Sequence, residues 1–130
     1  MKRGGIINAP LAGAIARLGH TDTIVVADAG LPIPPGVPVV DLAVVYGQPT
    51  FTSVLDALLA DAVFEHAWVS RQADDWPCGG WVDSRLGFAA ERVDHPDLKA
   101  MVANCRLAIR TGEDTAYSNV ILRCGVPFAV

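Results

Sequence analysis

The chain has 130 residues, a length typical of one domain, so we expect a single hydrophobic core. Its composition, 52% hydrophobic and 18% charged, excludes intrinsic disorder and suggests that other copies of the chain cover part of the surface. Ten basic residues are spread without a cluster and fourteen residues are acidic, so the net charge of −4 argues against nucleic acid as a partner.

No segment supplies the roughly 20 apolar residues that a membrane-spanning helix needs. The uncharged stretch 42–55 is too short and contains Gly47, Gln48 and Pro49. The basic residues near the N-terminus resemble the start of a signal peptide, but Asn8 and Pro10 interrupt the apolar stretch that follows and fit a helix start better. We therefore expect no membrane insertion.

The three cysteines, Cys78, Cys105 and Cys124, form no CxxC pair, and an odd number makes a poor disulfide framework. We expect reduced, mostly buried thiols in a cytoplasmic protein and no metal site. Neither GxGxxG nor GxxxxGK[ST] occurs, so the sequence does not predict a nucleotide cofactor.

The first part of the chain predicts a helix, a buried strand and an extended loop. Asn8 can cap a helix over 9–18 that Gly19 ends. Residues 23–27 are β-branched or small and apolar on both faces, which predicts a buried strand with Asp28 at its carboxyl end. Residues 30–38 hold four of the nine prolines and predict an ordered loop.

The middle of the chain predicts a strand over 39–45, a helix over 50–60 capped near Thr50, and a strand over 64–70. From 71 to 87 the pattern mixes turn-forming residues with large aromatics, and we expect a loop with at most one turn of helix.

The last part predicts a strand over 88–93, a helix from His95 to about Asn104 with Asp94 as its cap, and strands over 107–110 and 119–122. Strands that alternate with helices indicate a single-domain α/β fold in which helices pack on a largely parallel central sheet.

Two histidines lie beside breaks in the pattern. His20 follows the predicted helix stop at Gly19, and His95 precedes a helix. A neutral imidazole can take and give a proton near pH 7, and Asp22 and Asp28 lie close enough in sequence to orient His20. The alternative is a surface or hydrogen-bonded structural histidine, and this is our interpretation of His66 within its strand.

Polar groups also stand at predicted strand ends. The carboxyl ends of strands in α/β sheets border the crevices that bind ligands, which makes Asp28 a candidate binding residue; a turn-forming role before Gly30 is the alternative. Tyr117, Ser118 and Asn119 offer a phenol, a hydroxyl and a carboxamide, groups that bind sugar hydroxyls, although turn formation could also explain them.

Three separated motifs resemble the D-ribose pyranase and fucose mutarotase family, most closely its ribose branch. The resemblance runs from Lys2 to Phe128. The motifs are the segments 17–23 (RLGHTDT), 28–34 (DAGLPIP) and 110–113 (RTGE), the last followed by Tyr117-Ser118-Asn119 and Gly125-Val126.

The resemblance implies that residues 1–130 form one sugar mutarotase domain that interconverts β-D-ribopyranose and β-D-ribofuranose without a cofactor. It implies His20 as the catalytic acid. The implied substrate-binding residues are Asp28, His95, Lys99, Tyr117, Ser118 and Asn119. It further implies a cleft near a subunit boundary in a homo-oligomer, a decamer of two pentameric rings, and D-ribose as the partner sugar.

Two departures from the family pattern stand out. Ser118 occupies a position where the family often has alanine, and the segment 71–88, with Trp76 and Trp81, is shorter than the helical region of ribose members. Three alternatives stay open: a mutarotase for L-fucose or another monosaccharide, a non-catalytic sugar-binding partner of a transporter, and a structural oligomer without a ligand.

Overall fold

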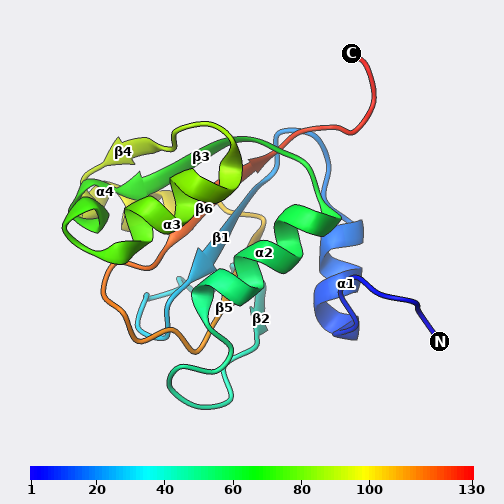
Figure 1. The fold of residues 1–130 in the computed structure, drawn as a ribbon, viewed down its shortest axis with the longest axis horizontal. Coiled ribbons are helices and arrows are strands. Elements are labelled where there is room, and N and C mark those ends of the chain that lie inside the picture. The colour runs from blue at the N-terminus through cyan, green and yellow to red at the C-terminus, as the bar shows by residue number, and fades with distance from the viewer.

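Six strands form one mixed sheet in the order β2-β5-β1-β6-β3-β4 (Figure 1). The computed structural model describes all residues 1–130. The strands are β1 (Thr23–Ala27), β2 (Val39–Asp41), β3 (Phe64–Ser70), β4 (Glu91–Val93), β5 (Leu107–Arg110) and β6 (Val120–Cys124). The pairs β1–β5, β2–β5 and β3–β4 are parallel, whereas β6 runs antiparallel to β1 and β3. The predicted α/β class is therefore confirmed.

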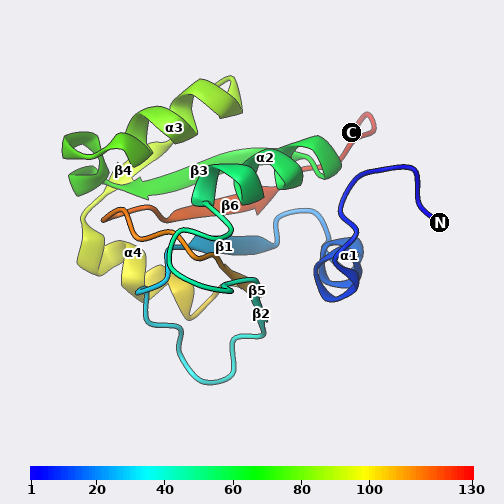
Figure 2. The ribbon, with the colours of Figure 1, turned by 60° about the horizontal axis from the view of Figure 1, so that its bottom comes forward.

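Helices cover both faces of this sheet (Figure 2). They are α1 (Ala9–Ala16), α2 (Phe51–Asp61), α3 (Pro77–Leu86) and α4 (His95–Val102), and a 3₁₀ helix, η1, spans Arg71–Asp75. In Figure 2, α2 and α3 lie above the sheet and α4 lies below it. The alternation of β1 matches this arrangement, because Ile24 and Val26 join the core under α2 and α3 while Val25 and Ala27 join the core with α4.

Local side-chain chemistry explains where the helices start. The Asn8 side chain accepts a hydrogen bond from the Leu11 amide at the start of α1, and Thr50 accepts one from the Ser53 amide at the start of α2. Asp94 occupies the cap position of α4, as predicted, but its side chain makes no capping hydrogen bond.

Two predicted strands are shorter in the structure. The strand expected over 39–45 ends at Asp41, because its carboxylate accepts a hydrogen bond from the Ala43 amide, which turns the chain away from the sheet. Val44 and Val45 consequently lie exposed in a loop. The strand expected over 88–93 comprises only Glu91–Val93.

The prediction of a loop over 71–87 is wrong. This segment forms η1 and the ten-residue helix α3, which Pro77 opens and Gly87, with φ of 75°, ends. Gly79 faces η1, where an added Cβ would lie 2.5 Å from the Asp74 carboxylate. Gly79 therefore permits a close contact between α3 and η1. Trp81 stacks with Phe51 of α2 at a ring distance of 6.4 Å.

Candidate active site

A polar pocket lies where the carboxyl ends of β1, β3 and β4 meet the start of β6. Antiparallel pairing of β6 with β1 brings Asn119 beside Asp28, and parallel pairing of β3 with β4 brings Ser70 beside the start of α4. The pocket has a volume of about 300 Å³. Its lining includes five of the residues that the sequence predicted for substrate binding: Asp28, His95, Lys99, Tyr117 and Asn119.

Asp28 and Asn119 hold each other in place. The Asn119 carboxamide oxygen accepts a hydrogen bond from the Asp28 amide at 2.9 Å, and its NH₂ group donates to the Asp28 carboxylate at 3.1 Å. The other Asp28 carboxylate oxygen accepts from the Gly30 amide at 3.0 Å. Asn119 is buried and Asp28 is half-buried, so the pair presents a fixed carboxylate edge to the pocket.

His95 is fixed on three sides. Its Nδ1 shares a hydrogen bond of 2.6 Å with the Ser70 hydroxyl, its amide donates to the Gln72 side-chain oxygen, and its ring meets Tyr117 edge-on at 4.9 Å. Burial lowers the pKa of His95, and the nearby Lys99 charge lowers this pKa further against a smaller opposing effect of Asp28. The pocket therefore favours a neutral imidazole.

The segment that carries Tyr117 has an unusual backbone. Tyr117 has φ of 59°, in the left-handed region that few non-glycine residues adopt, and such residues are frequent at functional sites. Ser118 is fully buried, does not line the pocket with its side chain, and has a hydroxyl without a hydrogen-bond partner. Trp76 lies near Tyr117 at a ring distance of 6.5 Å.

His20 lies at the opposite end of the sheet from the pocket. It precedes β1, whereas Asp28 follows it, and the five residues of β1 alone separate the two by roughly 16 Å at about 3.3 Å per residue. The structure therefore does not bring His20 of one chain together with the other predicted site residues of that chain.

Glu65, and not an aspartate, partners His20. The His20 Nε2 donates to the Glu65 carboxylate at 3.0 Å, and Arg123 donates to the other oxygen of that carboxylate at 2.9 Å. These bonds, led by that from His20, lower the pKa of Glu65. The expectation that Asp22 or Asp28 orients His20 of the same chain is wrong: Asp22 accepts from the Gly19 amide and from Arg106 instead.

Sequence reasoning missed Glu65, Ser70 and Gln72. Glu65 lies 45 positions from His20 and meets it only because β3 and the turn before β1 share one end of the sheet. Ser70 could have been predicted from one feature of the sequence: it is a polar residue at the carboxyl end of a strand whose neighbouring residues are apolar.

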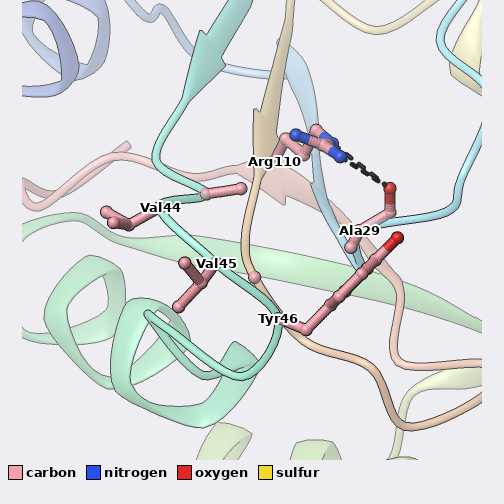
Figure 3. Close-up of a pocket in the computed structure, with 7 residues that line it drawn as sticks. Ala29, Val44, Val45, Tyr46 and Arg110 are labelled. Carbon is pink, nitrogen blue, oxygen red and sulfur yellow. Dashed lines mark hydrogen bonds between the residues drawn. The ribbon is translucent and has the colours of Figure 1, made fainter.

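Figure 3 shows a second, more apolar depression, whose lining includes Ala29, the residue after Asp28. It has a volume of about 350 Å³ and is lined by Ala29, Val44, Val45, Tyr46, Arg110 and two small residues. Arg110 donates to the Ala29 carbonyl and pairs with Asp41, whereas the side chains of Val44, Val45 and Tyr46 are exposed.

No cluster of three His, Cys, Asp or Glu side chains has the geometry to hold a metal ion. None of the helices is both long enough and apolar enough to span a bilayer. All three cysteines are free and buried, and burial raises the pKa of the Cys78 thiol to about 12.

The fold and pocket define a small α/β domain that presents hydrogen-bonding groups to a polar ligand at the carboxyl ends of its strands. Residues 1–127 match the model of the RbsD / FucU transport protein family, and the chain belongs to this family.

Known relatives agree with this assignment over almost the whole chain. The D-ribose pyranase 1 of Rubrobacter xylanophilus is 56% identical, and the D-ribose pyranase of Cutibacterium acnes is 52% identical; each alignment covers 98% of this chain and 100% of the relative. The structure of Bacillus subtilis RbsD complexed with D-ribose is similar with a TM-score of 0.93 at 36% identity, over 98% of this chain and 100% of that one. The fucose mutarotase of Streptococcus pneumoniae, in complex with L-fucose, shares the fold at 20% identity with a TM-score of 0.79, over 94% of this chain and 95% of that one.

Proposed function

We propose that this protein is an isomerase that interconverts β-D-ribopyranose and β-D-ribofuranose. The carrying observation is one pocket of about 300 Å³ that gathers Asp28, His95, Lys99, Tyr117 and Asn119. Full-length relatives named as D-ribose pyranases and a close structural relative complexed with D-ribose support ribose as the substrate. Residues 1–130 then form one sugar mutarotase domain.

The reaction opens a cyclic hemiacetal and closes it through a different hydroxyl. The anomeric hydroxyl loses a proton, the bond between the anomeric carbon and the ring oxygen breaks, and the ring oxygen gains a proton. Asp28 is the one carboxylate that lines the pocket, and we assign it to the anomeric hydroxyl. His95, Lys99, Tyr117, Asn119 and the Ser118 backbone position the remaining hydroxyls.

We assign His20 as the acid that protonates the ring oxygen and takes the proton back. Because His20 lies at the other end of its own sheet, a neighbouring copy must supply it to each pocket. Its ring is suited to this role: it is 43% exposed, Glu65 holds its Nε2, and Nδ1 is left to face a substrate.

We further propose a homo-oligomer, in the form of a decamer of two pentameric rings, located in the cytoplasm. The low charge content and the exposed side chains of Val44, Val45 and Tyr46 beside the pocket favour contact with a neighbouring copy. Three free, buried thiols fit a reducing compartment.

Exchange NMR on D-ribose with catalytic amounts of protein tests the function. We expect magnetisation transfer between the pyranose and furanose signals to accelerate in proportion to enzyme concentration. L-fucose and D-galactose run in parallel distinguish the sugar. If ribose binds in a titration but exchanges at the solvent rate, the protein is a binding partner and not an isomerase.

A further inference from the structure

The pocket residue His95 has two ring nitrogens with different surroundings. Nδ1 points at the Ser70 hydroxyl at 2.6 Å, whereas Nε2 makes no hydrogen bond within the protein and belongs to the ring edge turned away from Ser70. His95 is half-buried, and its position is set by α4, whose first residue it is. The nitrogen available to a ligand is therefore Nε2.

The Ser70 hydroxyl forms a hydrogen bond with His95 alone. Ser70 is the last residue of β3, it is fully buried, and the bond to His95 Nδ1 is the only hydrogen bond of its side chain. If Nδ1 carried the proton and donated it to Ser70, the hydroxyl hydrogen would be buried without an acceptor, which is costly. The favourable arrangement has the Ser70 hydroxyl donating to an unprotonated Nδ1.

We propose that Ser70 is a positioning residue that fixes His95 in the tautomer with its proton on Nε2. The neutral imidazole then presents an N–H donor to the pocket, opposite in sense to the Asp28 carboxylate, which only accepts. A sugar hydroxyl can accept a hydrogen bond from Nε2, whereas Asp28 accepts a hydrogen bond that a sugar hydroxyl donates. This assignment deepens the proposed function and rests on it for the identity of the ligand.

The charged groups around His95 are compatible with this neutral donor. Lys99, one turn along α4, faces the pocket and opposes a second positive charge, while Asp28 lies across the pocket. Asp94, the residue before His95, pairs with Arg71 outside the pocket.

Long-range ¹H–¹⁵N correlation spectra of the sugar-free, ¹⁵N-labelled protein at pH 8 test the assignment directly. His95 is identified as the signal lost in His95→Asn. We expect a single tautomer protonated on Nε2, with the Nδ1 shift displaced by an accepted hydrogen bond. A signal protonated on Nδ1 would overturn the proposal, whatever the activity of the protein, so its failure is distinguishable from failure of the proposed function.

Ser70→Ala tests the dependence on the hydroxyl. We expect the His95 Nδ1 resonance to move toward that of a nitrogen without a hydrogen bond, while the His20 and His66 signals stay in place. The KM for ribose should rise about 3- to 10-fold with a smaller change in kcat, since one positioning bond is lost. Ser84→Ala, an exposed serine on α3 whose hydroxyl bonds only to the Trp81 carbonyl, is the matched control and should change neither signal nor KM.

Ser70→Thr keeps the hydroxyl and should restore both the spectrum and KM. Unchanged His95 resonances in folded Ser70→Ala would contradict the proposal. Should Ser70→Ala fail to fold, the tautomer measured in the unmodified protein still decides the question.

Discussion

His20 is held by a carboxylate, and the pocket residues are held by one another. The pair formed by His20 and Glu65 is exposed to solvent, where an isolated ion pair contributes little to stability. The pair therefore orients an imidazole for proton transfer and adds little to the stability of the fold. The bonds between buried Asn119 and half-buried Asp28, by contrast, fix both side chains and prepare the pocket for a ligand.

Replacing His20 by asparagine should lower the ribose exchange rate by about 10²- to 10⁴-fold, the usual contribution of a positioned acid–base residue. Saturation-transfer NMR measures this rate. The control His66→Asn removes a half-buried histidine of β3 and should leave the rate unchanged. Size-exclusion chromatography should give the same assembly for both variants. An unchanged rate in His20→Asn would remove this residue from the mechanism.

The lowered pKa of His95 predicts a specific pH dependence of stability. An unfolded histidine binds a proton near about pH 6.5, whereas folded His95 binds one only at lower pH. As pH falls below about 6.5, the unfolded chain takes up the proton before the folded protein does. The stability contributed by neutral His95 is therefore fully present above about pH 6.5 and is lost on acidification through the folded pKa.

Urea unfolding of the unmodified protein and of His95→Asn, at fixed protein concentration between pH 7.5 and 5, measures this effect. The unfolding free energy of the unmodified protein minus that of His95→Asn should decrease as pH falls. A difference that grows on acidification would mean that the fold raises the pKa of His95.

At the scale of elements, α3 depends on one close approach. An added Cβ at Gly79 would lie 2.5 Å from the Asp74 carboxylate and 3.1 Å from the Ala73 carbonyl. Asp74 cannot move freely, because Arg92 donates to it at 2.8 Å and also bonds to Asp83 of α3. Gly80, the next residue, has open space around its Cα.

Gly79→Ala and Gly80→Ala should therefore have opposite effects. We expect Gly79→Ala to lower the unfolding free energy by about 1–3 kcal/mol, as for an overpacked site, and Gly80→Ala to raise it by about 0.5–1 kcal/mol through better helix propensity. Urea denaturation of both variants at one protein concentration measures the two changes. Equal effects would show that η1 and α3 do not pack as described.

The elements that the sequence predicted are those in which apolar periodicity dominates. β1 is buried on both faces and α2 buries Phe51, Leu55 and Leu58, so burial and pattern agree. Helix α3 was missed because Gly79 and Gly80 reduce helix propensity. The close contact with η1 that requires Gly79 exists only in the folded chain.

Local sequence patterns reveal only part of the candidate site. Asp28 and Asn119 could be predicted as neighbours of a crevice, because both flank buried strands. The pairing of His20 with Glu65, and of His95 with Ser70, depends on strand order and register, which no local pattern in a single sequence reveals.

At the scale of the whole molecule, the pocket and His20 lie at opposite ends of one sheet. If a neighbouring copy supplies His20, two inactive variants should complement each other. His20→Asn keeps an intact pocket, and Asp28→Asn keeps an intact imidazole, so an assembly of both contains some sites with neither substitution.

Each variant alone should show exchange near the solvent rate. After joint refolding in equal amounts, about one quarter of the sites should be complete if copies mix at random. Ribose exchange NMR measures the recovered rate, and native mass spectrometry verifies mixing. Mixed assemblies that stay inactive would contradict a site shared between copies.

The opposite placement of pocket and imidazole also bears on why a closed circle of subunits would be advantageous. In an open head-to-tail row, the pocket of the first subunit would lack an imidazole and the His20 of the last subunit would face no pocket. The fraction of incomplete sites would be greatest in short rows. Closing the row removes both loose ends, so that every subunit gives one imidazole and receives one, and the number of working centres equals the number of chains.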